Sequence, residues 1–150
     1  MTSSIESKLR AISDCLYRLS AKAVITDGDK VLLVKERGDD WWSFPGGGID
    51  YDESPIDALK RELREELGVT SQQISINNQV IYVTVGGVVA SVPRANLYYV
   101  VKLPINSLKL TGQVTDYSWF KLDELAGLYL SPSTEPLSPL ITIIKNLVAI

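Results

Sequence analysis

The stretch that decides the fold runs from Phe44 to Val69 and reads FPGGGIDYDESPIDALKRELREELGV. It combines a glycine turn, an acidic loop and a helical pattern. Ser54 is a preferred helix N-cap residue, and Pro55 suits the first helical position. Gly68 is placed to end the helix in a left-handed conformation. The stretch therefore predicts a capped helix that begins after Ser54 and ends before Gly68.

Four apolar residues of this predicted helix recur at three- and four-residue intervals, so they share one face that packs against a core. They are Ile56, Leu59, Leu63 and Leu67. Three glutamates, Glu62, Glu65 and Glu66, gather beside this face. Glu62 and Glu66 are one turn apart, and like charges at this spacing destabilise a helix by about 0.2–0.5 kcal/mol. A hard divalent cation would offset the repulsion, because it binds carboxylate oxygens.

The same stretch resembles the Nudix box, the sequence motif of the Nudix hydrolase family. The match begins at Gly47, continues after five residues with Glu53, and ends, after seven more, with the run RELREELGV from Arg61 to Val69. Each fixed position of the motif is present. The resemblance implies hydrolysis of nucleoside diphosphates linked to another group. For the fold it implies an α/β protein, an α/β/α sandwich with a mixed β-sheet.

The resemblance also implies what the residues of the motif do. The loop and helix hold a divalent metal against a pyrophosphate, and the metal polarises a phosphoryl oxygen and activates the attacking water. The expected metal ligands are Gly47, Glu62, Glu65 and Glu66. The expected catalytic residues are Glu53, Arg61, Glu62, Glu65 and Glu66. One of the glutamates accepts the proton of the water, and Arg61 orients the acidic residues through hydrogen bonds. Mg2+ is the expected cofactor, with Mn2+ as a substitute.

The composition narrows the chemistry. The chain has 150 residues and no histidine. This length suits one domain over 1–150 with a core of its own. The absence of histidine excludes Ser-His-Asp and Cys-His catalysis and histidine-bound zinc. Any general base or metal ligand must therefore be a carboxylate or, less readily, a lysine or a tyrosine.

Charge and hydropathy bear on partners and location. The formal net charge of −3 gives no broad attraction to nucleic-acid polymers, so the expected partner is a small-molecule nucleotide. No apolar run reaches the ~18 residues that a membrane helix needs, and the first residues do not form a secretory signal. The single cysteine, Cys15, excludes an internal disulfide and suits a reducing compartment. We expect a cytoplasmic protein with no membrane partner.

Hydrophobic periodicity predicts the elements before the motif. Helix-spaced apolar residues over 4–19 predict a helix in an N-terminal extension at 1–19. Two placements fit this helix, on its own domain or against a second subunit, and the second would make the protein a homodimer. Strands are expected at 21–26 and 30–35, as a hairpin around Asp27–Asp29.

The elements after the motif are mainly strands. Further strands are expected at 74–76, 79–85, 97–103 and 115–120. The Pro93–Asn96 segment predicts a turn, and Gly86 with its neighbouring glycine predicts a bulge or turn. A short helix starts at Lys121, and an amphipathic helix lies between Leu137 and Val148.

Four residues outside the motif are candidates for substrate binding. Arg37 follows the second strand, where similar family members place a basic residue that contacts a substrate phosphate; the alternative is a solvated strand end. Trp41 is either a base-stacking residue or an ordinary, partly buried tryptophan. Tyr82 lines a nucleoside pocket or packs within the sheet. Arg94, at the tip of the predicted turn, is a candidate phosphate contact.

Many relatives carry a further, distal glutamate some residues before a tryptophan at the last strand. The segment WFKLDEL, which begins at Trp119, resembles the one that follows this glutamate. Gln113 stands at the usual offset and Asp116 lies nearer, so Asp116 is the candidate distal carboxylate.

Two functions fit these residues. The first is metal-dependent hydrolysis of a pyrophosphate bond in a nucleoside triphosphate or a modified nucleotide, because nothing bulkier is indicated. The alternative is a catalytically silent, nucleotide-binding regulator on the same fold. The complete set of carboxylates favours the hydrolase.

Overall fold

The computed structural model describes residues 11, 16–89, 92–132 and 137–149. The strands in this part of the chain form two sheets. The first has the order β4-β1-β6-β5 and comprises β1 (Arg18–Val24), β4 (Gly46–Gly48), β5 (Ser75–Val89) and β6 (Val92–Lys102). It is mixed, because β1 runs parallel to β6 while the other pairs are antiparallel. The second is antiparallel, with the order β2-β3-β7, and comprises β2 (Thr26–Asp27), β3 (Lys30–Glu36) and β7 (Val114–Lys121).

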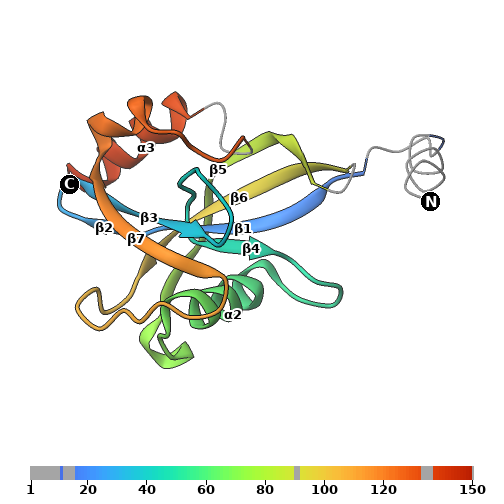
Figure 1. Ribbon diagram of the computed structural model, residues 1–150, viewed down its shortest axis with the longest axis horizontal. Coiled ribbons are helices and arrows are strands. Elements are labelled where there is room, and N and C mark those ends of the chain that lie inside the picture. Colours follow the sequence, from blue (N-terminus) through green and yellow to red (C-terminus); the bar gives the residue numbers. More distant parts are fainter. Residues whose placement is uncertain (1–10, 12–15, 90–91, 133–136, 150) are drawn as a thin grey trace.

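Helices lie on opposite sides of the sheets (Figure 1). The described helices are α2 (Pro55–Leu67), α3 (Ser138–Val148) and the 3-10 helices η1 (Ser71–Gln73) and η2 (Leu122–Gly127). The predicted α/β class with a mixed sheet between helices is confirmed, with the strands divided between two sheets. Among the described residues no helix is both long and apolar enough to cross a membrane.

Local sequence sets both ends of α2. The Ser54 hydroxyl accepts a hydrogen bond from the Asp57 amide at 3.1 Å, and Pro55 opens the first turn. Gly68 follows the helix with a φ of 66°, a left-handed conformation that glycine adopts without strain. Its amide donates to the Arg64 carbonyl at 3.2 Å. The predicted limits of this helix are confirmed.

The apolar face of α2 fills the core on its side of the sheets. Leu59, Leu63 and Leu67 are fully buried and belong to a cluster with apolar residues of β1 and β3, while Ile56 is partly buried at its edge. Full burial of a leucine side chain stabilises the folded state by about 1.5–3 kcal/mol. A second buried cluster contains apolar residues of α3 and η2. Packing therefore fixes the helices on both sides.

Several other predicted elements are confirmed. β2 and β3 form the hairpin around Asp27–Asp29, with Asp27 opposite Lys30, but the strand expected at 21–26 is divided between β1 of the first sheet and β2 of the second. β5 shows a register shift between Gly86 and Val88, at the predicted bulge. β7, η2 and α3 lie where the periodicity placed a strand, a short helix and a final helix.

The prediction of an N-terminal helix over 4–19 is wrong at the C-terminal end of this range. Arg18 and Leu19 belong to β1, where they pair with Arg94 and Ala95 of β6 in a parallel ladder. Leu19 is also 44% exposed, so it does not belong to a packed helical stripe. Pairing with a distant strand outweighs the local helical spacing here. The rest of this prediction, except residues 11, 16 and 17, lies outside the described residues.

Two predictions around β5 and β6 are also wrong. The strands expected at 74–76 and 79–85 belong to one strand, β5. The residues between them are accommodated by shifts in the pairing register of β5 with β6. The turn expected at Pro93–Asn96 lies inside β6. Pro93 precedes the first residue that pairs with β1, so its missing N–H interrupts no hydrogen bond to that strand.

Candidate active site

The glycine turn and α2 meet at the edge of the four-stranded sheet. β4 pairs with β1, which places Gly46 opposite Lys22. Gly46 has a φ of 126°, and a Cβ added there would lie 2.1 Å from the Ala21 carbonyl oxygen. A Cβ on Gly47 would lie 2.6 Å from the Glu62 carboxyl carbon. Glycine at 46 therefore lets the turn lie against β1, and glycine at 47 lets it approach the Glu62 side chain of α2.

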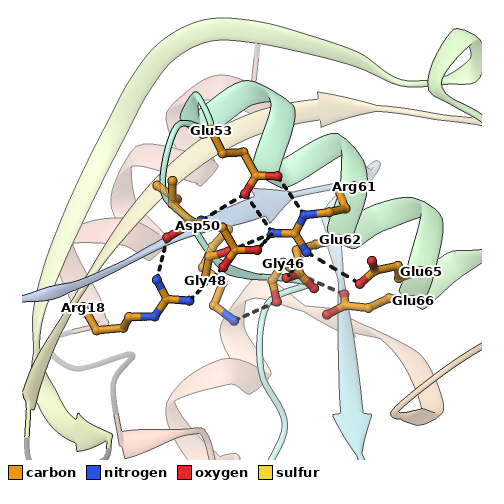
Figure 2. A network of polar contacts seen from close by, with 11 residues as sticks. Arg18, Gly46, Gly48, Asp50, Glu53, Arg61, Glu62, Glu65 and Glu66 are labelled. Carbon is orange, nitrogen blue, oxygen red and sulfur yellow. Dashed lines mark hydrogen bonds and ion pairs between the residues drawn. The ribbon is translucent and has the colours of Figure 1, made fainter.

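Arg61 lies at the centre of the acidic residues (Figure 2). Its guanidinium binds Glu53 in a bidentate pair, with Nε–Oε2 of 2.8 Å and Nη2–Oε1 of 2.9 Å. Nη1 donates to Glu62 Oε1 at 2.8 Å, and Nη2 donates to the Gly48 carbonyl at 3.0 Å. Glu65 completes the group with a longer ion pair of 3.6 Å. We call Arg61 with Glu53, Glu62 and Glu65 the Arg61 cluster.

These contacts keep Glu53 charged. Hydrogen bonds from Arg61, followed by one from the Asp50 amide, lower the pKa of Glu53 to about 2. The hydrogen bond to Glu53 likewise raises the pKa of Arg61. Both partners are ionised across the neutral range, and their geometry is the planar, two-bond arrangement that arginine makes best.

Glu66 differs from the other glutamates in its burial. It is 5% exposed, and its Oε2 accepts a hydrogen bond from the Gly46 amide at 3.0 Å. Burial raises the pKa of Glu66 to about 8, against the opposing charge of Lys22. Burial disfavours the charged form of Glu66, and a bound cation would stabilise it. Glu65, by contrast, is exposed, with 59% of its side chain accessible.

Lys22 is a residue of the site that the sequence analysis missed. It is 8% exposed in β1, and its Nζ donates to the carbonyls of Phe44 and Gly46 at 3.3 and 3.2 Å. Burial lowers its pKa, and the charge of Glu66 opposes that shift. Lysines are almost never buried without a partner, so a lysine in the middle of an apolar strand was the available signal.

Replacing Lys22 by methionine is expected to lower the free energy of unfolding by about 1–3 kcal/mol, because two carbonyls lose their hydrogen-bond donor and the buried Glu66 loses a nearby positive charge. Urea denaturation without metal measures this change. Lys30→Met is the matched control, since Lys30 is exposed in β3 and should change stability by about 0.5 kcal/mol at most. Equal losses in the two variants would show that the buried contacts of Lys22 contribute nothing.

Arg18 and Glu36 also reach the site and were not predicted to. Arg18 donates to the Ile49 carbonyl and pairs with Asp50 at 3.4 Å, so it joins β1 to the loop before α2. Glu36 ends β3, and its charge acts on both Lys22 and Glu66. The sequence analysis did not assign Arg18 to the site because it placed this residue in a helix. Glu36 can be assigned to the site only when β3 is known to lie beside β1 and α2.

The structure places the remaining candidates apart from the Arg61 cluster. Arg37 is exposed after β3, and its amide donates to the Gln113 carbonyl. The Trp41 ring meets Tyr129 edge to face at 6.0 Å. Asp116 is exposed in β7 opposite Lys35. Within the described ranges these three side chains make no hydrogen bond or ion pair with the cluster, so their functional roles stay predictions.

Tyr82 and Arg94 lie on the strands of the four-stranded sheet. Tyr82 of β5 stands opposite Tyr98 of β6, with ring centroids 6.3 Å apart. Arg94 is half-buried in β6, in register with Arg18 rather than at a loop tip. Burial and the charge of Arg18 lower the pKa of Arg94.

Curated relatives match the chain over part of its length. The RNA pyrophosphohydrolase of Ruthia magnifica subsp. Calyptogena magnifica is 51% identical over 61 residues, which are 40% of this chain and 34% of that protein. The RNA pyrophosphohydrolase of Halorhodospira halophila is 42% identical over 53 residues, 35% of this chain and 29% of that protein. The matches thus span about a third of the length of these relatives.

Solved structures match over most of the chain. A C. elegans Ap4A hydrolase in a binary complex has a TM-score of 0.73 at 20% identity and covers 88% of this chain and 98% of its own. The solution structure of the E. coli ORF135 protein has a TM-score of 0.68 at 24% identity, with 92% and 95% covered. At these identities the likeness shows the fold.

A family model extends the resemblance from the motif to the domain. The model of the NUDIX domain matches residues 16–141. That range includes β1 with Arg18 and Lys22, the glycine turn and α2. The chain therefore belongs to the NUDIX domain family.

Proposed function

We propose that the protein is a divalent-metal-dependent hydrolase of a pyrophosphate bond in a nucleoside diphosphate-linked substrate. The observation that carries this proposal is the Arg61 cluster, which lies against Gly47 and beside the buried carboxylate of Glu66. Nudix hydrolases generally use divalent metal ions and act on nucleotides. The names of the relatives, which include pyrophosphohydrolases, agree with this chemistry.

The residues present fit a hard divalent cation, for which we propose Mg2+, with Mn2+ as a substitute. The oxygens of Gly47, Glu62, Glu65 and Glu66 would hold it. When bound, the cation polarises a phosphoryl oxygen and lowers the pKa of the attacking water. In the described part of the chain no three acidic side chains already converge as a cage. Mg2+ keeps several waters and takes substrate phosphates as ligands, so the protein would supply only part of its coordination.

The contacts of Glu53 narrow the choice of proton acceptor. Its Oε1 accepts from Arg61 and from the Asp50 amide at 3.0 Å, and its Oε2 accepts from Arg61. Both oxygens are engaged, and a carboxylate with a pKa of about 2 is a weak base. We therefore assign Glu53 and Arg61 to positioning, and the proton of the attacking water to one of the helix glutamates.

For the substrate we propose a nucleoside triphosphate or a modified nucleotide. Arg37 and Arg94 are the proposed phosphate contacts, and Trp41 and Tyr82 the proposed contacts to the nucleoside. The exposure of Tyr129 beside Trp41 supports a base-stacking surface there. Asp116 remains the proposed distal carboxylate.

We further propose a single domain over the chain, a cytoplasmic location and a homodimer. The single cysteine in the sequence supports a reducing compartment. β5 supports self-association, because it lies at the edge of its sheet and exposes Val83 and Val85.

An assay of phosphate and pyrophosphate release across a nucleotide panel, with Mg2+ and with chelator, tests the function. The expected result is metal-dependent release from at least one nucleotide. The alternative, a silent nucleotide-binding regulator, predicts binding by calorimetry with no release from any member of the panel. That outcome would remove the hydrolase proposal.

Mg2+ is expected to raise the melting temperature of the wild type and to raise that of Glu66→Gln much less. Metal adds RT ln(1 + [L]/Kd) to the stability of the folded state, about 2.7 kcal/mol at a hundred times Kd. Without metal, Glu66→Gln should be as stable as the wild type or slightly more stable, because the repulsion between Glu62 and Glu66 is removed. Melting curves with Mg2+ and with chelator measure both effects. An equal shift in the two proteins would place the metal away from α2.

A further inference from the structure

Both backbone groups of Gly46 point away from β1, the strand that pairs with β4. The Ala23 amide donates to the Pro45 carbonyl at 2.8 Å, so these two residues form a hydrogen-bonded pair beside the antiparallel β1–β4 ladder. Bonded pairs alternate with pairs whose N–H and C=O groups face away from the partner strand. Gly46, opposite Lys22, belongs to the next pair. Its N–H and C=O groups are therefore available to side chains.

Two buried side chains of opposite charge bind these groups. The Gly46 amide donates to Glu66 Oε2 at 3.0 Å (Figure 2). The Gly46 carbonyl accepts from Lys22 Nζ at 3.2 Å. Glycine has more conformational freedom than any other residue, and Gly46 uses it at a φ of 126°. Two charge-assisted hydrogen bonds, one on each side of its Cα, hold Gly46 in one conformation.

Lys22 also ties the glycine turn to the core. Its Nζ donates to the Phe44 carbonyl at 3.3 Å, so one ammonium group joins two carbonyls on either side of Pro45. The Phe44 side chain is 1% exposed in the second buried cluster and meets the Tyr98 ring edge to face at 5.4 Å. Gly46 is thus held relative to a residue that packing already fixes.

The charge of Lys22 is itself unfavourable for a cation site. It acts on Glu66 and Glu62, two of the proposed metal ligands, so Lys22 lies near the place where a cation would bind. A buried ammonium also costs free energy, because two neutral carbonyls replace its water only in part. By charge alone, Lys22 would repel the metal and weaken its binding. Its contacts offer an effect of the opposite sign, the ordering of the turn.

We propose that Lys22 is a positioning residue for the divalent cation. It fixes Gly46, and the Gly46 amide in turn holds the Glu66 carboxylate in one orientation for the metal. This role rests on the proposed function in taking Glu66 as a metal ligand. It goes beyond that function, because a lysine of β1, outside the motif, then governs metal affinity.

Titration of the metal-free protein with Mn2+ tests this role, with free Mn2+ measured by its electron paramagnetic resonance signal. We expect Lys22→Met to raise the Kd for Mn2+ about tenfold or more, the effect typical of losing a residue that orients metal ligands. If Lys22 acted by charge alone, the same variant would lower the Kd. Lys30→Met is the matched control, because it removes the same charge from an exposed position in β3 and should leave the Kd unchanged.

Thermal melting in chelator separates positioning from stability. A purely structural role would lower the melting temperature of Lys22→Met and leave the Kd of the folded protein unchanged. Lys22→Gln keeps a polar donor on a shorter side chain and has the same expected effect on the Kd, so it serves if the methionine variant does not fold. An unchanged or lower Kd in the Lys22 variants, or an equal rise in Lys30→Met, would overturn the proposal.

The same titration distinguishes the role of Lys22 from the proposed function. If wild-type binding is lost in Glu66→Gln, the metal lies at α2, and an unaltered Kd in Lys22→Met would then refute the role of Lys22 alone. Absence of Mn2+ binding by the wild type would refute both. The titration involves no turnover, so a protein that binds Mn2+ as expected but hydrolyses no nucleotide would refute the hydrolase and leave the role of Lys22 intact.

Discussion

Replacement of Glu66 by glutamine is expected to lower kcat by about a hundredfold to a thousandfold at saturating Mg2+, the range typical for loss of one electrostatic group at a reacting centre. The glutamine oxygen can still accept the hydrogen bond that the Gly46 amide donates at 3.0 Å. The change therefore removes the charge and preserves the shape. Steady-state kinetics on the best nucleotide of the panel measures the loss, and melting shows that the fold survives.

Asp57→Asn is the control for this experiment. Asp57 is exposed in the first turn of the same helix, and the cap depends on the Ser54 side chain rather than on the Asp57 carboxylate. Its replacement removes one negative charge outside the cluster, so kcat should stay near the wild-type value and the free energy of unfolding should change by about 0.5 kcal/mol or less. Glu65→Gln tests the exposed end of the site in the same way. Near-normal turnover in both glutamate variants would mean that the motif is not the active site.

Replacement of Arg61 by alanine is expected to reduce both activity and stability. Glu53, Glu62 and the Gly48 carbonyl would lose the group that binds them. Loss of partners that orient metal ligands typically lowers metal affinity or activity by about tenfold to a hundredfold. Hydrogen bonds to charged groups contribute about 1.5–3 kcal/mol each, so a stability loss of this order is expected. Urea denaturation and kinetics at several Mg2+ concentrations measure the two effects.

Arg61→Lys distinguishes charge from geometry. Lysine keeps the charge but lacks the planar fork that pairs with both oxygens of Glu53. It should recover part of the stability and leave an elevated Mg2+ requirement. Full recovery of both by lysine would contradict the role of the bidentate pair.

Local signals were sufficient for much of the fold. The N-cap, first-turn proline and terminal glycine of α2 lie within a few residues of one another, and the hairpin of β2 and β3 follows from a short turn. β1 and β6 were misjudged at their starts, because their extents depend on each other. The first pair of that parallel ladder joins Arg18 to Arg94. Neither residue carries a local strand signal.

The site residues likewise divide into those that the local motif indicated and those whose contacts are made with distant parts of the chain. The motif indicated Glu53, Arg61 and the helix glutamates, and the structure brings Arg61 into contact with three of them. Lys22 carried a local signal, as a lysine within an apolar strand, but its contacts could not be predicted because they are made with carbonyls of a turn more than twenty residues away. Whether Asp116 acts as a distal carboxylate stays a prediction, since its exposed position in β7 neither supplies nor excludes that role.

Polar or charged side chains alternate with apolar ones along β1. An error in its alignment with β4 and β6 would therefore place every side chain on the wrong face. A slip by one residue would turn Lys22 and Arg18 toward the core on the α2 side and turn Ala21 and Ala23 toward the opposite face of β1. The slipped sheet would bury two cations among leucines and leave Glu66 without its lysine. Such a misaligned species is strongly disfavoured, so Arg18 and Lys22 also help to select the correct pairing of β1 during folding.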